Sequence, residues 1–262
     1  MMRYLRLYKH FVKFSLMQAM QFRFDFFFKI AMDCIFYLVN ILFYKILFAH
    51  TGGLAGWSES QVMIFLAGFL MVDAIQMTVI SSGCWMIPGL VNKGELDYYL
   101  LRPVSSLFFL STRSFAFDSF INVLVAAGIL VWAFVTSPVT YPLYKILIFL
   151  FLTLNGTYLF FQMRIIALAP IFWTHSGRGL EMIYWTLTKF GERPDGIFRG
   201  VVRLVLVSIM PFAIMSSFPA RALFQENTWE VAGYCVAVVL VLHFVMVKIW
   251  NFGLKSYSSA SS

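Results

Sequence analysis

Charged residues are scarce in this chain. Only 12% of its 262 residues are Asp, Glu, Lys or Arg, whereas 61% are hydrophobic. A water-soluble domain carries about 25% charged residues, because its surface must stay solvated. A soluble core of this size would leave too little polar surface, so lipid is the solvent that fits this composition. The composition predicts an all-α integral membrane protein.

Residues that support catalysis or bind metals are also sparse. The three cysteines, Cys34, Cys84 and Cys235, form no CxxC pair, and no histidine has a second ligand at metal-binding spacing. The chain contains neither a G-x-S-x-G motif nor a G-x-x-x-x-G-K-[ST] phosphate-binding loop. We therefore predict no catalytic residue, no metal and no cofactor in this chain.

Apolar stretches of about 20 residues are long enough for an α-helix to cross a bilayer. The fifth such stretch is the weakest, because it is short and contains Pro211. A further stretch, Ile171–Phe190, contains His175, Arg178, Glu181 and Lys189, so we predict that it is interfacial or a cytoplasmic extension. The six predicted spans are Phe26–Phe48, Gln61–Ser81, Ser114–Thr136, Tyr144–Pro170, Val201–Phe218 and Val231–Trp250.

The net charge of +8 comes from basic residues that flank the apolar stretches. This placement favours anionic lipid headgroups over nucleic acid as the partner. Lys and Arg gather in the N-terminal stretch, after spans two and four, and at the C-terminus, while the alternating loops are nearly free of them. Because basic loops stay in the cytoplasm, the pattern predicts two cytoplasmic termini.

The two ends of the chain differ in character. In residues 1–24 apolar and basic side chains alternate near helical spacing, which favours an amphipathic helix in the plane of the membrane over a plain extension of the first span. The tail Ser256–Ser262 is rich in serine, and we predict that it is disordered. Residues 1–255 are predicted to form a single transmembrane domain.

Asp73 lies in the middle of the second predicted span. A charge at that depth costs about 2.5–3.5 kcal/mol on insertion scales, so its side chain should face protein or water. It either lines a substrate path or contacts another subunit, or it makes a structural hydrogen bond. Lys29 is four residues from both Asp25 and Asp33 and can pair along one helix face.

The loop between spans two and three, residues 82–106, is long for a connector. Its apolar residues recur at steps of three and four, which predicts short amphipathic helices that break at Gly94 and stop before Pro103. Such helices can present an apolar face to a soluble partner or lie flat on lipid, and periodicity alone does not decide between the two.

The same loop resembles a known family. The segment Gly94-Glu-Leu-Asp-Tyr-Tyr-Leu-Leu-Arg-Pro-Val104 is similar to the G-x-L-D-x-x-L-L-R-P signature of permease subunits of type-2 ATP-binding-cassette (ABC-2) exporters, in a formerly uncharacterised branch. Three more segments fit in order along the chain: Gly56-Trp57-Ser58, Arg193-Pro-Asp-Gly-Ile-Phe198, and Met210-Pro211 followed by Phe218-Pro-Ala-Arg221.

The resemblance implies a transport subunit of the bacterial cytoplasmic (inner) membrane, without catalysis of its own. A partner ATPase would bind ATP and Mg, and a second permease, identical or a sister, would complete the substrate path. It also implies a short re-entrant segment on the outer side at Pro219–Glu230. Coupling to the ATPase would fall to Lys93, Gly94, Glu95, Leu96, Asp97, Leu100, Leu101 and Arg102.

Two other functions remain open from the sequence. A membrane-embedded enzyme acting on lipid would need acids, bases or metal ligands gathered near one membrane face, whereas the histidines and carboxylates are scattered. A scaffold or sensor subunit that transports nothing would need no such cluster.

Overall fold

The computed structural model describes residues 2–21, 23–208 and 210–257. Within this part of the chain all regular elements are helices, which confirms the all-α prediction. The π-helix is η1, and η2 and η3 are 3₁₀-helices. In order the elements are α1 (Met2–Gln21), α2 (Arg23–His50), α3 (Glu59–Gln76), η1 (Met77–Ser81), α4 (Ser82–Cys84), α5 (Ile87–Asn92), α6 (Asp97–Leu100), α7 (Ser106–Thr112), α8 (Phe117–Val135), α9 (Leu143–Leu168), α10 (Ile171–Thr174), α11 (Gly177–Thr188), η2 (Lys189–Glu192), η3 (Asp195–Ile197), α12 (Gly200–Ser208), α13 (Phe212–Phe224) and α14 (Thr228–Ser256).

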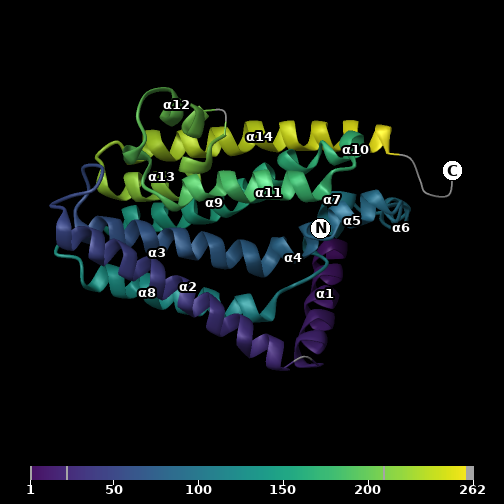
Figure 1. Cartoon of the computed structure of the whole chain (residues 1–262), viewed down its shortest axis with the longest axis horizontal. Coiled ribbons are helices and arrows are strands. Elements are labelled where there is room, and N and C mark those ends of the chain that lie inside the picture. The colour runs from purple at the N-terminus through teal and green to yellow at the C-terminus, as the bar shows by residue number, and fades with distance from the viewer. Residues whose placement is uncertain (1, 22, 209, 258–262) are drawn as a thin grey trace.

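The long helices run along one axis, so the molecule has two ends (Figure 1). We call the end with α5, α6 and α7 the proximal end, and the end with the loops 51–58 and 136–142 the distal end. Five helical stretches are long and apolar enough to cross a membrane, and they match predicted spans one to four and six. They are Arg23–His50, Glu59–Asn92, Phe117–Val135, Leu143–Thr174 and Thr228–Ser256.

The middle of α3 is enclosed, since every residue from Val62 to Leu70 is buried. It packs against α8, α9 and α13. Glycine permits close approach elsewhere in this core, since a Cβ on Gly156 would lie 2.4 Å from the carbonyl oxygen of Met215. That carbonyl lies four residues before Pro219, which has no N–H to donate to it. The contact with Gly156 therefore falls where α13 has no helical hydrogen bond.

The predicted span Val201–Phe218 is not a single helix, and the bent pair that replaces it is either one broken span or a re-entrant loop. The stretch is divided between α12 and α13, which meet at 89°. Pro211 lies at this bend, where proline lacks an N–H and disfavours helical backbone before it. The predicted re-entrant segment Pro219–Glu230 is also wrongly bounded, because α13 continues through Pro219 to Phe224 and α14 begins at Thr228.

The stretch Ile171–Glu192, which contains the range Ile171–Phe190 that the sequence excluded as a span, runs the length of the bundle beside α9. It starts at the proximal end, where the ring of Phe172 lies 5.3 Å from that of Trp250. Midway, the Tyr184 hydroxyl donates to the Phe160 carbonyl. At the end of the stretch, the backbone carbonyl of Glu192 accepts a hydrogen bond from the hydroxyl of Tyr44, which lies in the distal part of α2.

The following residues therefore lie at the distal end. Gly196 packs against Ala55 of the loop 51–58, and Figure 1 shows α12 far from α5 and α6. The prediction that the whole basic segment after the fourth span shares the end of the termini is wrong for Arg193, Arg199 and Arg203. The physical reason is that part of the charge at this end is neutralised: Arg203 of the segment and Arg221 of α13 both contact Asp195, whose side chain is fully buried.

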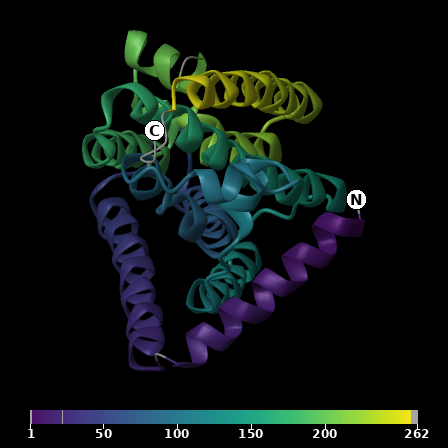
Figure 2. The ribbon, with the colours of Figure 1, turned by 90° about the vertical axis from the view of Figure 1, so that its right-hand side faces the viewer.

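The N-terminal helix α1 lies across the proximal end, roughly perpendicular to the bundle axis (Figures 1 and 2). Tyr4 and Phe11 stack edge-on against Phe108 and Phe109 of α7. The helix itself is as predicted, and its location in the membrane surface remains a prediction. At the other terminus, α14 includes Ser256, so the predicted tail begins within a helix, and residues 258–262 lie outside the described residues.

Candidate functional site

The proximal loop, residues 85–106, folds as its sequence predicts. Gly94 has a φ of 68°, a left-handed conformation that favours glycine, and it separates α5 from α6. α6 ends at Leu100, before Pro103. Four apolar side chains of the loop are buried against α9, α10 and α14: Ile87, Leu90, Val91 and Leu96. The loop is thus a folded part of the proximal end.

The C-terminus holds this loop in place. The Leu96 backbone N–H donates to the Tyr257 hydroxyl at 3.2 Å. Burial, and then the nearby Asp97 carboxylate, raise the pKa of Tyr257, so the phenol stays protonated at neutral pH. The hydroxyl therefore stays a neutral acceptor for the Leu96 N–H.

Most of the predicted coupling residues form one exposed surface. Leu101 is 84% exposed and Tyr98, a neighbour that the prediction did not include, is 72% exposed. We call the set Lys93, Glu95, Tyr98, Leu100, Leu101 and Arg102 the proximal patch; all six are exposed. Leu96 is fully buried, and Gly94 and Asp97 are half-buried, so these three predicted residues shape the loop rather than its surface.

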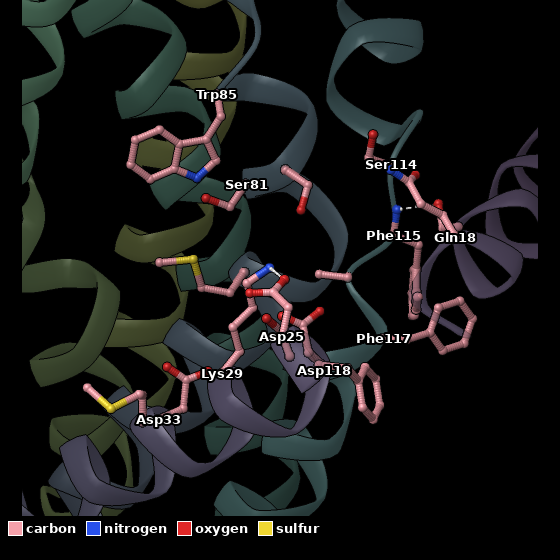
Figure 3. Close-up of a pocket in the computed structure, with 18 of the residues that line it drawn as sticks. Gln18, Asp25, Lys29, Asp33, Ser81, Trp85, Ser114, Phe115, Phe117 and Asp118 are labelled. Carbon is pink, nitrogen blue, oxygen red and sulfur yellow. Dashed lines mark hydrogen bonds and ion pairs between the residues drawn. The ribbon is translucent and has the colours of Figure 1, made fainter. Parts of the chain in front are cut away.

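A cavity of about 610 Å³ lies between α1, α2, η1 and the start of α8 (Figure 3). We call it the acidic cavity, because four carboxylates line it against one ammonium group, that of Lys29. Its electrostatics favour a positively charged group inside. Aromatic and methionine side chains form much of the remaining wall. The four carboxylates are those of Asp25, Asp33, Asp73 and Asp118.

The carboxylates are held in different ways. Lys29 Nζ lies 2.6 Å from Asp25, as the spacing predicts, whereas Asp33 accepts a hydrogen bond from Asn122 of α8. Gln76 Nε2 donates to Asp73 at 3.3 Å, which is the structural hydrogen bond that the sequence left open. Asp73 also lines the cavity, so the other alternative stays open too. No sequence pattern predicted that Asp118 lines the cavity or that Asn122 donates to Asp33, because both depend on how α8 packs.

A buried network joins this cavity to the proximal loop. Arg164 lies inside the bundle, with its side chain 1% exposed. Its guanidinium donates to Ser81 at 2.7 Å and to Glu181 at 3.0 Å. It also lies 4.7 Å from the ring centroid of Trp85, which stacks on Trp185. Ser81 and Trp85 both line the acidic cavity, so one side chain contacts the cavity wall and the start of the loop.

The backbone changes helix type where this network meets α3. Residues Met77–Ser81 form a π-helix between α3 and α4. Such π-turns often occur at functional sites, because they widen the helix and free backbone carbonyls. As for metals, no group of three or more His, Cys, Asp or Glu side chains among the described residues could hold an ion.

Comparison with known proteins adds the family. The family model described as "ABC-2 family transporter protein" matches residues 34–261. The chain belongs to the ABC-2 transporter family. It is a multi-pass membrane protein and a transport permease subunit, and its family works with an ATP-binding-cassette component. Neither a curated protein nor a solved structure matches this permease. The matched range covers the proximal loop and both ends of α14, and it begins after α1.

Proposed function

We propose that this permease forms half of the pathway of an ABC exporter and that a separate ATPase subunit drives it by docking on the proximal patch. The observation that carries the proposal is the build of the proximal loop. Its four buried apolar side chains fix it to α9, α10 and α14, while Leu101 and Tyr98 are exposed among charged side chains. A large exposed apolar surface rimmed by polar groups is typical of a protein interface.

Side-chain contacts connect the proximal patch to the interior of the bundle. The patch continues into α5, and α5 follows Trp85, whose ring lies over the Arg164 guanidinium. Arg164 in turn bonds Ser81 on the wall of the acidic cavity. A shift of the proximal loop would therefore move the cavity wall through contacts between rigid elements. ATP and Mg would be bound by the ATPase.

The acidic cavity supplies the inner part of the pathway in this proposal, with Asp73 at its inner wall. The second half of the path would come from another permease, identical or a sister. The membrane-spanning α2 supports this, because only 6% of its apolar 18-residue stretch is buried within the chain. Its exposed row of large apolar side chains, including Ile35, Leu42 and Ile46, would face the second permease or lipid.

We infer that the proximal end faces the cytoplasm of the bacterial inner membrane. Basic side chains collect there without acidic partners, including Lys93, Arg102 and Lys255. The distal arginines Arg203 and Arg221 are instead paired with Asp195. An excess of Lys and Arg at one end of the spans indicates the cytoplasmic side. The ATPase would then reach the patch from the cytoplasm.

The test is co-purification and ATPase activity of the complex in proteoliposomes. Leu101→Asp places a charge in the centre of the apolar surface, and Glu95→Lys reverses one charge of the rim. We expect Leu101→Asp to lower ATPase association at least tenfold, about 1.4 kcal/mol, with a smaller loss for Glu95→Lys. Glu226→Lys, an equally exposed charge reversal at the distal end, is the control and should leave association unchanged. Equal association of all three variants would contradict docking at the patch.

Transport is tested separately with Asp73→Asn, which keeps the shape of the side chain and removes its charge. We expect the ATPase to remain bound and active while export of the cargo falls. Normal export by this variant would remove Asp73 from the pathway. An ATPase that binds and is stimulated while no cargo moves in the unmodified complex would favour a scaffold or sensor subunit.

A further inference from the structure

A second cavity, of about 570 Å³, lies at the proximal end between α1 and the α6–α7 segment. It is lined by His10, Phe11, Lys13, Phe14, Met17, Tyr99, Arg102, Phe109 and Arg113, and we call it the basic cavity. No carboxylate is among these residues. None of the ion pairs formed by the described residues involves Lys13, Arg102 or Arg113. Three cations therefore share this cavity without an acidic neighbour to neutralise them.

Aromatic rings hold the two arginines in place. The Arg102 guanidinium lies 5.3 Å from the ring centroid of Phe109, and that of Arg113 lies 5.1 Å from Tyr99. Arg113 also donates to the Tyr99 hydroxyl. A guanidinium carries five N–H donors, so both groups keep donors for a ligand after these contacts. Arginine held in this way suits an oxyanion, because its planar donors match phosphate oxygens.

The same cavity has an apolar side. Phe14 and Met17, on the exposed face of α1, are 67% and 64% exposed. α1 lies across the bundle axis at the proximal end (Figure 2), so if it rests in the membrane surface as predicted, this face lies at the level of the lipid headgroups. A ligand that fits would combine an anionic head for the arginines with an apolar body for Phe14 and Met17.

We propose that the basic cavity binds an anionic phospholipid. Its phosphate contacts Arg102 and Arg113, Lys13 adds charge from α1, and an acyl chain lies along Phe14 and Met17. The bound lipid bridges α1 to the segment that carries the proximal patch. Arg102 belongs to both this site and the proximal patch, but lipid binding is measured on the purified chain without an ATPase, so its failure and that of docking or transport are separate results.

The experiment measures lipid binding to the purified full chain by native mass spectrometry, with phosphatidylglycerol and phosphatidylcholine of the same acyl chains as probes. We expect tighter binding of phosphatidylglycerol. Each basic group near a membrane surface contributes about 1 kcal/mol, so Arg102→Gln with Arg113→Gln should weaken it roughly 30-fold. The control Arg178→Gln with Lys255→Gln removes the same charge from exposed proximal residues outside the cavity and should leave binding unchanged.

The Arg113 substitution also removes a contact with Tyr99 and could disturb the cavity wall. Lys13→Gln therefore serves as a second variant, because it leaves the contacts of the two arginines with Tyr99 and Phe109 unchanged. We expect it to weaken phosphatidylglycerol roughly fivefold. Equal weakening by the cavity pair and the control pair would overturn the site. Equal binding of both lipids would do the same. Inorganic phosphate that competes as strongly as the lipid would show a site for free phosphate and would overturn the lipid assignment.

Discussion

Two ion pairs of this permease differ in what surrounds them. Lys29 and Asp25 pair on the outside of α2, with side chains 54% and 58% exposed. Arg164 and Glu181 pair inside the bundle, with side chains 1% and 13% exposed. The first pair exchanges its partners with water, whereas the second has only protein to stabilise it. The comparison teaches that charge in a membrane protein can organise the interior as well as mark its cytoplasmic face.

The largest effect should come from breaking the buried pair. Glu181→Gln leaves the Arg164 guanidinium buried without its counter-charge, and we expect a loss of about 3–5 kcal/mol in the free energy of unfolding. Denaturant unfolding in detergent micelles measures this. Adding Arg164→Met to the same chain removes the orphaned charge and should restore part of the stability. A double variant no more stable than the single one would show that the charge is not the cause.

A smaller effect is expected at the distal cluster. Asp195 is fully buried, but its partners Arg203 and Arg221 are 45% and 19% exposed and can reach water. We therefore expect Asp195→Asn to cost less than Glu181→Gln, about 1.5–3 kcal/mol, the range for a hydrogen bond to a charged group. The same unfolding assay compares the two. A larger loss at Asp195 than at Glu181 would reverse the order that exposure predicts.

The smallest effect should come from the exposed pair. Asp25→Asn removes the partner of Lys29, and exposed pairs spaced by four residues contribute about 0.3–0.5 kcal/mol. The change in unfolding free energy should be close to the error of the assay and should vanish at high salt. A loss above 2 kcal/mol would show that the pair is essential to the structure, which its exposure does not predict.

The difference between exposed and buried ion pairs also explains how far the sequence could predict the fold. Five spans could be predicted from the length of the apolar stretches alone. The helix break and the helix end in the proximal loop could be predicted from Gly94 and Pro103. Ile171–Phe190 was excluded as a span because it contains charged residues such as Glu181, which count against a span in isolation. Only the packed structure shows that Arg164, on another helix, neutralises Glu181.

The candidate site was predictable to a similar degree. Asp73 and Lys29 stood out as charges within apolar helices, and the proximal patch stood out by periodicity and family resemblance. The acidic cavity as a whole did not, because Asp118 and Asn122 reach α2 only through the packing of α8. The Arg164 network was missed because its four partners come from two regions of the chain, residues 81–85 and 181–185, that are distant from each other in sequence.

The central claim is that residues 171–199 pass from the proximal to the distal end of the bundle. In a chain with Cys34, Cys84 and Cys235 replaced by serine, single cysteines at Arg178→Cys and Arg199→Cys are labelled with a membrane-impermeant maleimide in sealed vesicles. Both positions are exposed. Lys255→Cys and Glu59→Cys mark the proximal and distal sides. We predict that the Arg178→Cys variant labels from the side of Lys255→Cys, and the Arg199→Cys variant from the side of Glu59→Cys. Labelling of both from the Lys255→Cys side would contradict the account.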